Sequence, residues 1–237
     1  MGDGRDTVKA LCAGGMNVVM MTHNPGPALE LQKEVIDAGL PGKCVFYAED
    51  FSVPREEREA GRLEQIMKDF GSIDVIISNT GDLGPDKEIE EITEEDLKNA
   101  LSNLVLGSFH MVQTSVPYLK KSTSPRIILM TSVGACSGST KESLVNCIAK
   151  GAVRSMALNL AERLAPYGIT VNAVAKGPIP RIEGSREGSV KPETMLPDVP
   201  MGRLGTPVDL ANVISFFASE ESSYVTGQVL AVSGGMK

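Results

Sequence analysis

Six short apolar runs are spaced along this chain, and most of them are too short to form helices. They cover residues 18–22, 44–48, 74–78, 127–131, 170–174 and 228–232. Glycine, proline and asparagine bound these runs, as is typical of strands that are buried on both faces. The pattern therefore predicts six β-strands.

Longer amphipathic segments separate the apolar runs and are predicted to be helices. They span residues 27–38, 54–70, 94 to about 119, and 207–217. Gly39 and Gly71 follow the first two segments as common C-terminal stops. Thr93 and Asp96 resemble a capping box at the start of the third. Strands that alternate with helices predict an α/β fold with a doubly wound parallel sheet, flanked by helices on both faces, in a single domain over residues 1–237.

One long segment, residues 178–200, lacks a periodic pattern and contains five prolines. Long loops in compact domains often act as lids over a binding site. The segment is interpreted either as a substrate lid or as a solvated loop.

Composition narrows the classes of function. Hydrophobic residues make up 42% of the chain and charged residues 22%, which is ordinary for a soluble globular protein. The formal net charge of −7 argues against a nucleic-acid partner. No apolar run is long enough to span a bilayer, so we expect no membrane partner.

The four cysteines show no spacing that is typical of metal ligands, so no metal site is predicted. They are Cys12, Cys44, Cys136 and Cys147. Unpaired cysteines are typical of reduced thiols in the cytosol, which predicts a cytoplasmic protein.

Several motifs follow the predicted strands or close the chain. They are Ser78-Asn79-Thr80-Gly81, Thr131-Ser132-Val133-Gly134, Asn146-Cys147-Ile148-Ala149-Lys150, Gly202-Arg203-Leu204-Gly205-Thr206-Pro207, Tyr224-Val225-Thr226-Gly227-Gln228 and Ser233-Gly234-Gly235. In this order the chain resembles the short-chain dehydrogenase/reductase family over nearly its whole length. The resemblance implies a Rossmann-like sheet and hydride transfer between NAD or NADP and a small carbonyl or alcohol.

The resemblance also implies roles for four residues. Ser132 would hydrogen-bond the substrate oxygen, Lys150 would hold the nicotinamide ribose, and Asn103 would hold a water in a proton relay. Asn146 stands where the family has a tyrosine that protonates the substrate. An amide has no proton to give at neutral pH, so we expect impaired or altered proton transfer.

The spacing of Asn146 and Lys150 keeps the family's register, because residues four apart share one helix face. Asn146 can still donate a hydrogen bond to a carbonyl oxygen. Cys147 is the nearest alternative acid, with a role as a small packing residue as the other reading. Ser143 occupies the tyrosine position of the enoyl-reductase variant of the motif, so that variant does not apply.

The glycine-rich cofactor loop is incomplete. Only Gly2-Asp3-Gly4-Arg5 remains, and it leads directly into a predicted helix without the preceding strand. In the family that strand is central, and its turn presents backbone N–H groups to the cofactor pyrophosphate. Either the neighbouring strands close the gap, or the natural polypeptide is longer, which an intact mass would show.

Further cofactor contacts are implied at the ends of the other strands. Asp50 matches an aspartate that binds the adenine ring, and His23 lies where NADP users often carry arginine. Asn79, Gly81, Lys150 and Gly177 complete the implied set. NADP is therefore favoured slightly over NAD. Lys176 replaces the proline that precedes this glycine in the family, and Arg181 replaces a threonine.

Two functions remain open on this sequence. The first is an NAD(P)-dependent oxidoreductase, and the second is a catalytically silent relative that acts as a structural or ligand-binding partner. Two long helices, about 94–121 and 143–166, have enough apolar positions for a core and an interface together. We therefore expect a homodimer or homotetramer.

Overall fold

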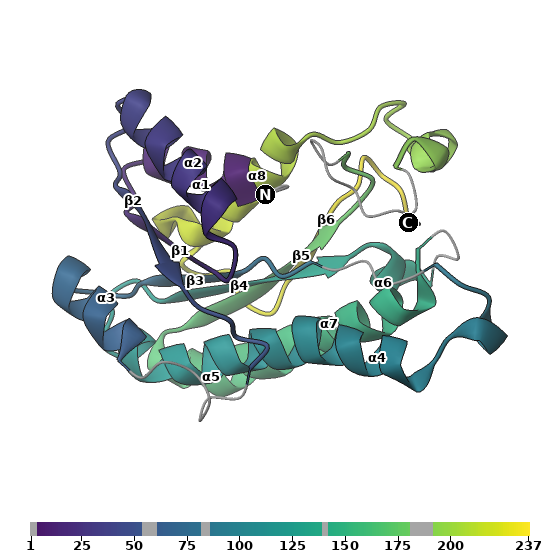
Figure 1. Ribbon diagram of the computed structural model, residues 1–237, viewed down its shortest axis with the longest axis horizontal. Helices are drawn as coiled ribbons and strands as arrows, with labels where there is room; N and C mark the ends of the chain where they lie inside the picture. Colours follow the sequence, from purple (N-terminus) through teal and green to yellow (C-terminus); the bar gives the residue numbers. More distant parts are fainter. Residues whose placement is uncertain (1–3, 54–60, 82–85, 139–141, 181–191) are drawn as a thin grey trace.

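The computed structural model describes residues 4–53, 61–81, 86–138, 142–180 and 192–237 (Figure 1). Within them, all six predicted strands are present, two with the predicted ends. They are β1 (Val18–Thr22), β2 (Cys44–Ala48), β3 (Val75–Ser78), β4 (Arg126–Ser132), β5 (Thr170–Lys176) and β6 (Val229–Val232). Every strand pair is parallel, so all strands end at the same edge.

The predicted helices are also present in the described residues, where helix ends differ by a few positions. The α-helices are α1 (Gly4–Ala13), α2 (Pro25–Asp37), α3 (Arg62–Phe70), α4 (Glu94–Ala100), α5 (Gly107–Leu119), α6 (Gly134–Ser137), α7 (Leu144–Leu164) and α8 (Pro207–Ala218). A π-helical turn, η3 (Leu101–Leu106), joins α4 to α5. The capping box of Thr93 and Asp96 opens α4 as predicted. Residues 54–60 of the helix predicted over 54–70 lie outside the described part.

Helices cover both faces of the strands, as a doubly wound fold requires. In Figure 1, α1, α2 and α8 lie above the strands, whereas α5 and α7 lie beneath them. On the upper side, α1 and α8 share an apolar cluster with β4, to which Leu11, Ile214 and Ile128 belong. The lower layer contributes Val112 of α5 and Val153 of α7 to a second cluster. The predicted fold class is confirmed in this respect.

The strands form two separate sheets. One has the order β1-β2 and the other the order β3-β4-β5-β6. The expectation that neighbouring strands close the gap is therefore wrong, because β1 and β3 share no ladder in the described residues. The two sheets meet through side chains instead, since Val19 and Met21 of β1 and Ile76 of β3 contribute to the same apolar cluster.

In the described residues 193–200 of segment 178–200, two side chains are buried and the others are exposed. Residues Pro192–Asp198 form a 3₁₀-helix, η5. Met195 and Val199 are buried in a small cluster with Met236, near the C-terminus. Residues 181–191, including Arg181, lie outside the described residues. The interpretation of this segment as a lid remains a prediction.

Candidate functional site

Ser132 is the last residue of β4 and lies opposite Lys176 in the register with β5. Its side chain is 7% exposed, and its Oγ accepts a hydrogen bond of 3.1 Å from the backbone N–H of Ala135. That bond satisfies one of the free N–H groups at the start of α6. The predicted substrate-binding serine therefore stands at the carboxyl end of a buried central strand.

Lys150 connects α7 to the ends of two strands. Its side chain is 6% exposed, and Nζ donates hydrogen bonds of 2.7 Å to Thr80 O and 2.9 Å to Met130 O. Thr131 Oγ1 in turn donates to the backbone oxygen of Lys150 at 2.8 Å. The amine is thus held between the end of β4 and the chain that follows β3.

Asn146 lies one turn before Lys150 on α7 and is only 1% exposed. Its Nδ2 donates a 3.2 Å hydrogen bond to Glu142 Oε2. Its Oδ1 is buried and has no hydrogen-bond partner among the described residues. The amide at the family's tyrosine position is therefore covered by a carboxylate.

The sequence analysis missed Glu142. Its Oε1 accepts a 2.9 Å hydrogen bond from the backbone N–H of Gly134. A Cβ atom at Gly134 would lie 2.6 Å from Glu142 Cδ, so the glycine makes room for the carboxyl group. Glu142 precedes the N-cap Ser143 of α7, so its contact with Asn146 does not follow from helix periodicity.

Cys147 is a poor alternative acid. Burial raises the pKa of its thiol to about 11, and the negative charge of Glu142 acts in the same direction. A group that titrates so far above neutral pH is badly matched to proton transfer. This supports the reading of Cys147 as a packing residue.

Asn103 lies on the π-helical turn η3. The neighbouring Leu104 is fully buried in a cluster with Val145 and Ala149 of α7. The Asn103 side chain itself is exposed. Short π-helical turns inside α-helices often occur at functional sites. The structure thus brings the turn beside α7 and leaves the Asn103 amide open to solvent.

The start of α1 lies at the strand ends. A Cβ atom at Gly4, the first residue of α1, would be 3.1 Å from Asn79 Nδ2. Asn79 follows β3, and both it and Gly81 are exposed. Gly2 lies outside the described residues. The N-terminus of a ten-residue helix, with its free N–H groups, therefore lies beside the predicted cofactor residue Asn79.

His23 and Asp50 come together at the ends of β1 and β2. His23 Nδ1 is 4.0 Å from Asp50 Oδ2. Burial opposes ionisation of Asp50, but hydrogen bonds from the Ser52 hydroxyl and N–H outweigh it and hold the pKa of this carboxyl below its usual value. Asp50 thus closes a turn, in addition to any contact with a ligand.

Gly177 follows β5 and is required by packing. A Cβ atom there would lie 2.6 Å from Ser233 Cα, which is closer than real Cβ atoms come.

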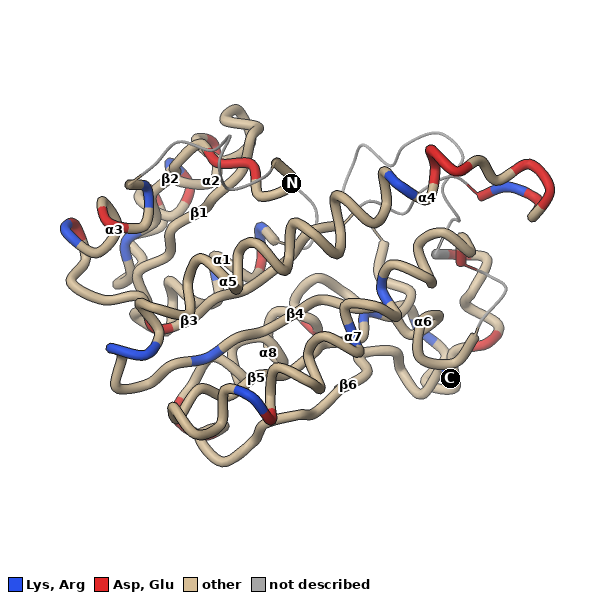
Figure 2. The backbone as a smooth tube through the Cα atoms, turned by 90° about the horizontal axis from the view of Figure 1, so that it is seen from below, with Lys and Arg blue, Asp and Glu red and all other residues tan. Residues whose placement is uncertain are grey.

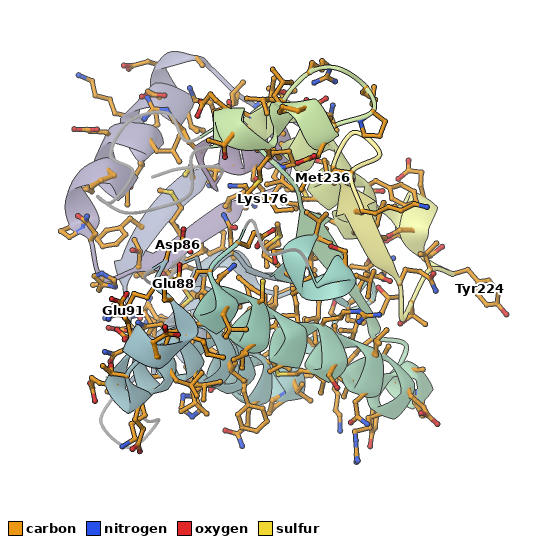
Figure 3. The ribbon with its side chains drawn as sticks, turned by 90° about the vertical axis from the view of Figure 1, so that its right-hand side faces the viewer. Asp86, Glu88, Glu91, Lys176, Tyr224 and Met236 are labelled. Atoms are coloured by element: carbon orange, nitrogen blue, oxygen red, sulfur yellow. The ribbon has the colours of Figure 1, made fainter. Side chains whose placement is uncertain are left out.

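Figure 3 shows Lys176 near the middle of the side where the strands end, with Asp86, Glu88 and Glu91 to its left. Figure 2 shows that acidic residues gather on this segment before α4.

Other kinds of site find little support in the described part of the chain. It contains no group of three histidine, cysteine or acidic residues arranged to hold a metal ion. None of its helices combines the length and the apolar character needed to cross a membrane. A hollow of about 660 Å³ lies between α1, α2 and α8, but none of the candidate residues lines it.

Residues 2–237 match the family model described as enoyl-(acyl carrier protein) reductase. A 3-oxoacyl-(acyl-carrier-protein) reductase of Thermotoga maritima is 33% identical over 213 residues, which cover 87% of this chain and 85% of the relative. General stress protein 39 of Bacillus subtilis is 35% identical over 214 residues, which cover 88% of this chain and 71% of that protein.

Solved structures agree with these sequence matches. An NAD⁺-bound xylitol dehydrogenase superposes with a TM-score of 0.86 at 25% identity and covers 98% of this chain and 94% of its own. A 3-oxoacyl-(acyl-carrier-protein) reductase from Brucella melitensis with bound NAD has a TM-score of 0.84 at 26% identity. The match covers 99% of this chain and 87% of that reductase. Because the family model matches almost the whole length of this chain, the chain belongs to the short-chain dehydrogenase/reductase family.

Proposed function

We propose that this protein is an NAD(P)-dependent oxidoreductase that acts on a small carbonyl or alcohol substrate with altered proton transfer. The observation that carries the proposal is Lys150, whose amine is held at the ends of β3 and β4. Ser132 lies on the same strand end as Met130, which accepts from that amine. A cation and a hydroxyl are thus positioned together where ligands bind in open α/β sheets.

The residues along the carboxyl edge fit a nicotinamide dinucleotide. The N-terminus of α1 at Gly4 suits a pyrophosphate, because free backbone N–H groups favour an anion. His23 and Asp50 suit the adenosine half, and Lys150 suits the nicotinamide ribose. Asn79 and Gly81 lie between these groups, after β3. The cofactor, when bound, supplies the hydride-transfer chemistry of the family.

The most direct test is calorimetric titration of the protein with NADPH and with NADH. We expect micromolar binding of at least one cofactor, with NADPH favoured slightly. A Lys150→Met variant should bind more weakly. Lys98→Met changes an exposed lysine that pairs with Glu94, and this variant should bind like the parent protein. The absence of binding at millimolar cofactor would contradict the proposal and favour a catalytically silent relative.

The proposal includes a homodimer or homotetramer. Large apolar side chains are exposed on η3, α5 and α7, namely Leu106, Phe109, Leu144, Ile148 and Leu158. A contiguous apolar face on two long helices is typical of a surface that a partner subunit covers. Light scattering should give a mass at least twice the 25.2 kDa of the chain. A monomer at micromolar concentration would contradict this assembly.

A further inference from the structure

Of the hydrogen-bonded pair Glu142 and Asn146, the carboxylate of Glu142 is the more open polar group. Glu142 is partly exposed, whereas Asn146 is buried. The amide donates along its own N–H direction to Glu142 Oε2 at 3.2 Å. The carboxylate therefore lies beyond the tip of the Asn146 side chain, in the direction in which a longer side chain at position 146 would extend.

Ser132 and Glu142 accept hydrogen bonds from adjacent backbone amides. The N–H of Ala135 donates to Ser132 Oγ at 3.1 Å, and the N–H of Gly134 donates to Glu142 Oε1 at 2.9 Å. Consecutive N–H groups at a helix start point in similar directions, so the hydroxyl and the carboxylate lie side by side. A substrate oxygen bound to Ser132 would be a neighbour of Glu142.

The orientation of the Asn146 amide follows from this carboxylate. The reverse orientation would bring Asn146 Oδ1 against a negatively charged oxygen, and an ionised carboxylate is only an acceptor. The observed orientation leaves Oδ1 buried without a partner among the described residues, which is unfavourable by itself. The hydrogen bond to Glu142 therefore determines the orientation of the Asn146 amide, and the same bond holds the carboxylate in place.

We propose that Glu142 is the proton acceptor for the hydroxyl of an alcohol substrate and that Asn146 is its positioning residue. This inference rests on the proposed function. In the step, the alcohol O–H proton moves to a Glu142 oxygen while the carbinol C–H bond breaks and its hydride leaves to the oxidised nicotinamide. The alcohol becomes a carbonyl, and the protonated Glu142 then releases its proton to water.

The arrangement favours an alcohol over a carbonyl as the ligand of this pair. A carboxylate accepts hydrogen bonds and cannot donate one, so it binds a hydroxyl and repels a carbonyl oxygen. Each Glu142 oxygen accepts one hydrogen bond from the described residues, and a carboxylate oxygen has a second lone pair that can accept another. The site therefore differs from a tyrosine site, in which a phenol donates to the substrate oxygen.

The test compares Glu142→Gln with Glu162→Gln, a matched change at an exposed position of α7. With NAD⁺ or NADP⁺, whichever binds, the oxidation of cyclohexanol and of xylitol is followed across pH. The parent protein should show a rate that falls toward acid pH as the base becomes protonated. Glu142→Gln should lose about 10²–10⁴-fold in kcat and this acidic limb, with little change in cofactor affinity. Glu162→Gln should retain both.

A second variant moves the carboxyl group without removing it. Gly134→Ala places a Cβ 2.6 Å from Glu142 Cδ, so the glutamate must shift while its charge remains. We expect a smaller loss of kcat than in Glu142→Gln, with the acidic limb still present but displaced. If thermal unfolding shows that Gly134→Ala does not fold, Asn146→Ala is used in its place. Asn146→Ala deletes the hydrogen bond that supports Glu142, so we again expect a smaller loss of kcat and a displaced acidic limb.

The titratable groups near Glu142 on the packed helices are the thiols of Cys136 on α6 and Cys147 on α7, with Lys150 and Arg154 further along α7. Because these groups can also affect the pH profile, an NMR spectrum that reports on Glu142 itself is recorded as well. In ¹³Cδ-glutamate NMR, the signal that disappears in Glu142→Gln is assigned to Glu142. It should shift when cyclohexanol is added without cofactor, and much less when cyclohexanone is added.

The outcomes separate this inference from the proposed function. If cofactor binds but Glu142→Gln keeps the parental kcat and pH profile, the role of Glu142 is overturned and the oxidoreductase proposal stands. If no cofactor binds, the proposed function fails, and the NMR response alone decides whether Glu142 receives a hydroxyl. A Glu142 signal that does not respond to cyclohexanol overturns the inference in either case.

Discussion

The β1–β2 sheet and the β3–β6 sheet are built from similarly apolar strands, but only the larger sheet has strands that are buried along nearly their whole length, the central β4 and β5. Every residue of β4 is buried, and so are six of the seven residues of β5. In β1 only Met20 is buried, and in β3 only Ser78. Both of these poorly buried strands border the gap between the sheets. Apolar sequence alone therefore does not produce burial, because a central strand also needs a neighbour on each side.

The same division separates the candidate functional groups. His23 and Asp50 follow the two strands of the smaller sheet, whereas Ser132 ends β4 of the larger sheet and Lys150 of α7 donates to Met130 of that strand. Gly4 lies between them, against Asn79. A dinucleotide that contacts all of these groups would bridge the two sheets. Its binding would then stabilise the fold, since a ligand that binds only the native state shifts unfolding by mass action.

The largest expected effect comes from deleting the same atoms in each sheet. Val171→Ala in β5, at 0% exposure, should lower the free energy of unfolding by about 2–3 kcal/mol. Val19→Ala in β1 removes the same two carbons from a half-buried position and should cost about 1 kcal/mol. Urea denaturation of both variants measures the difference. Equal losses would show that the two sheets are equally well packed.

A somewhat smaller effect is expected in native-state hydrogen exchange. Amides of β4 and β5 should exchange only through global unfolding, because they lie in buried ladders on both sides. Amides of β1 have a ladder on one side only, so we expect them to exchange at least about tenfold faster, which corresponds to about 1.4 kcal/mol. NADPH or NADH should slow β1 exchange if it bridges the sheets. Uniform protection across β1, β4 and β5 would contradict the division.

These differences explain how far the sequence could predict the molecule. The ends of β1 and β2 could be predicted from the residues that flank these strands. The capping box at Thr93 could be predicted from its local sequence in the same way. The break between the sheets depends on pairing between distant strands, which local patterns do not record. The contact of Glu142 with Gly134 joins residues that are eight positions apart along the chain. The hydrogen bond between His110 Nδ1 and Phe51 O joins residues that are 59 positions apart. Site geometry was therefore less predictable than the elements.

Alkaline pH should weaken the smaller sheet first. Burial raises the pKa of the Cys44 thiol to about 12, and contact with Cys12 adds to this shift. Because the folded state holds the proton more tightly than the unfolded state, this stability is complete below about pH 9 and is lost as the pH rises toward 12. Thermal unfolding between pH 8 and 11 should show the decline. Cys44→Ala should flatten it more than Cys147→Ala, whose thiol has a pKa of about 11.

The smallest expected effect concerns cofactor choice at the edge of the smaller sheet. His23→Arg replaces an imidazole by a permanent cation beside Asp50. The site is exposed, so the added charge should strengthen NADPH binding by only about two- to fivefold and leave NADH binding nearly unchanged. Calorimetry at low and at high salt measures this, and salt should reduce the gain.

Tyr224→Arg provides the matched control for His23→Arg, because Tyr224 is fully exposed before β6 and points away from the molecule in Figure 3. It adds the same charge at a distant position and should not alter NADPH affinity. If both variants gain equally, the effect is one of net charge on a protein that carries −7. If only His23→Arg gains, the adenosine half of the cofactor contacts the smaller sheet, and the two sheets then divide cofactor choice from chemistry.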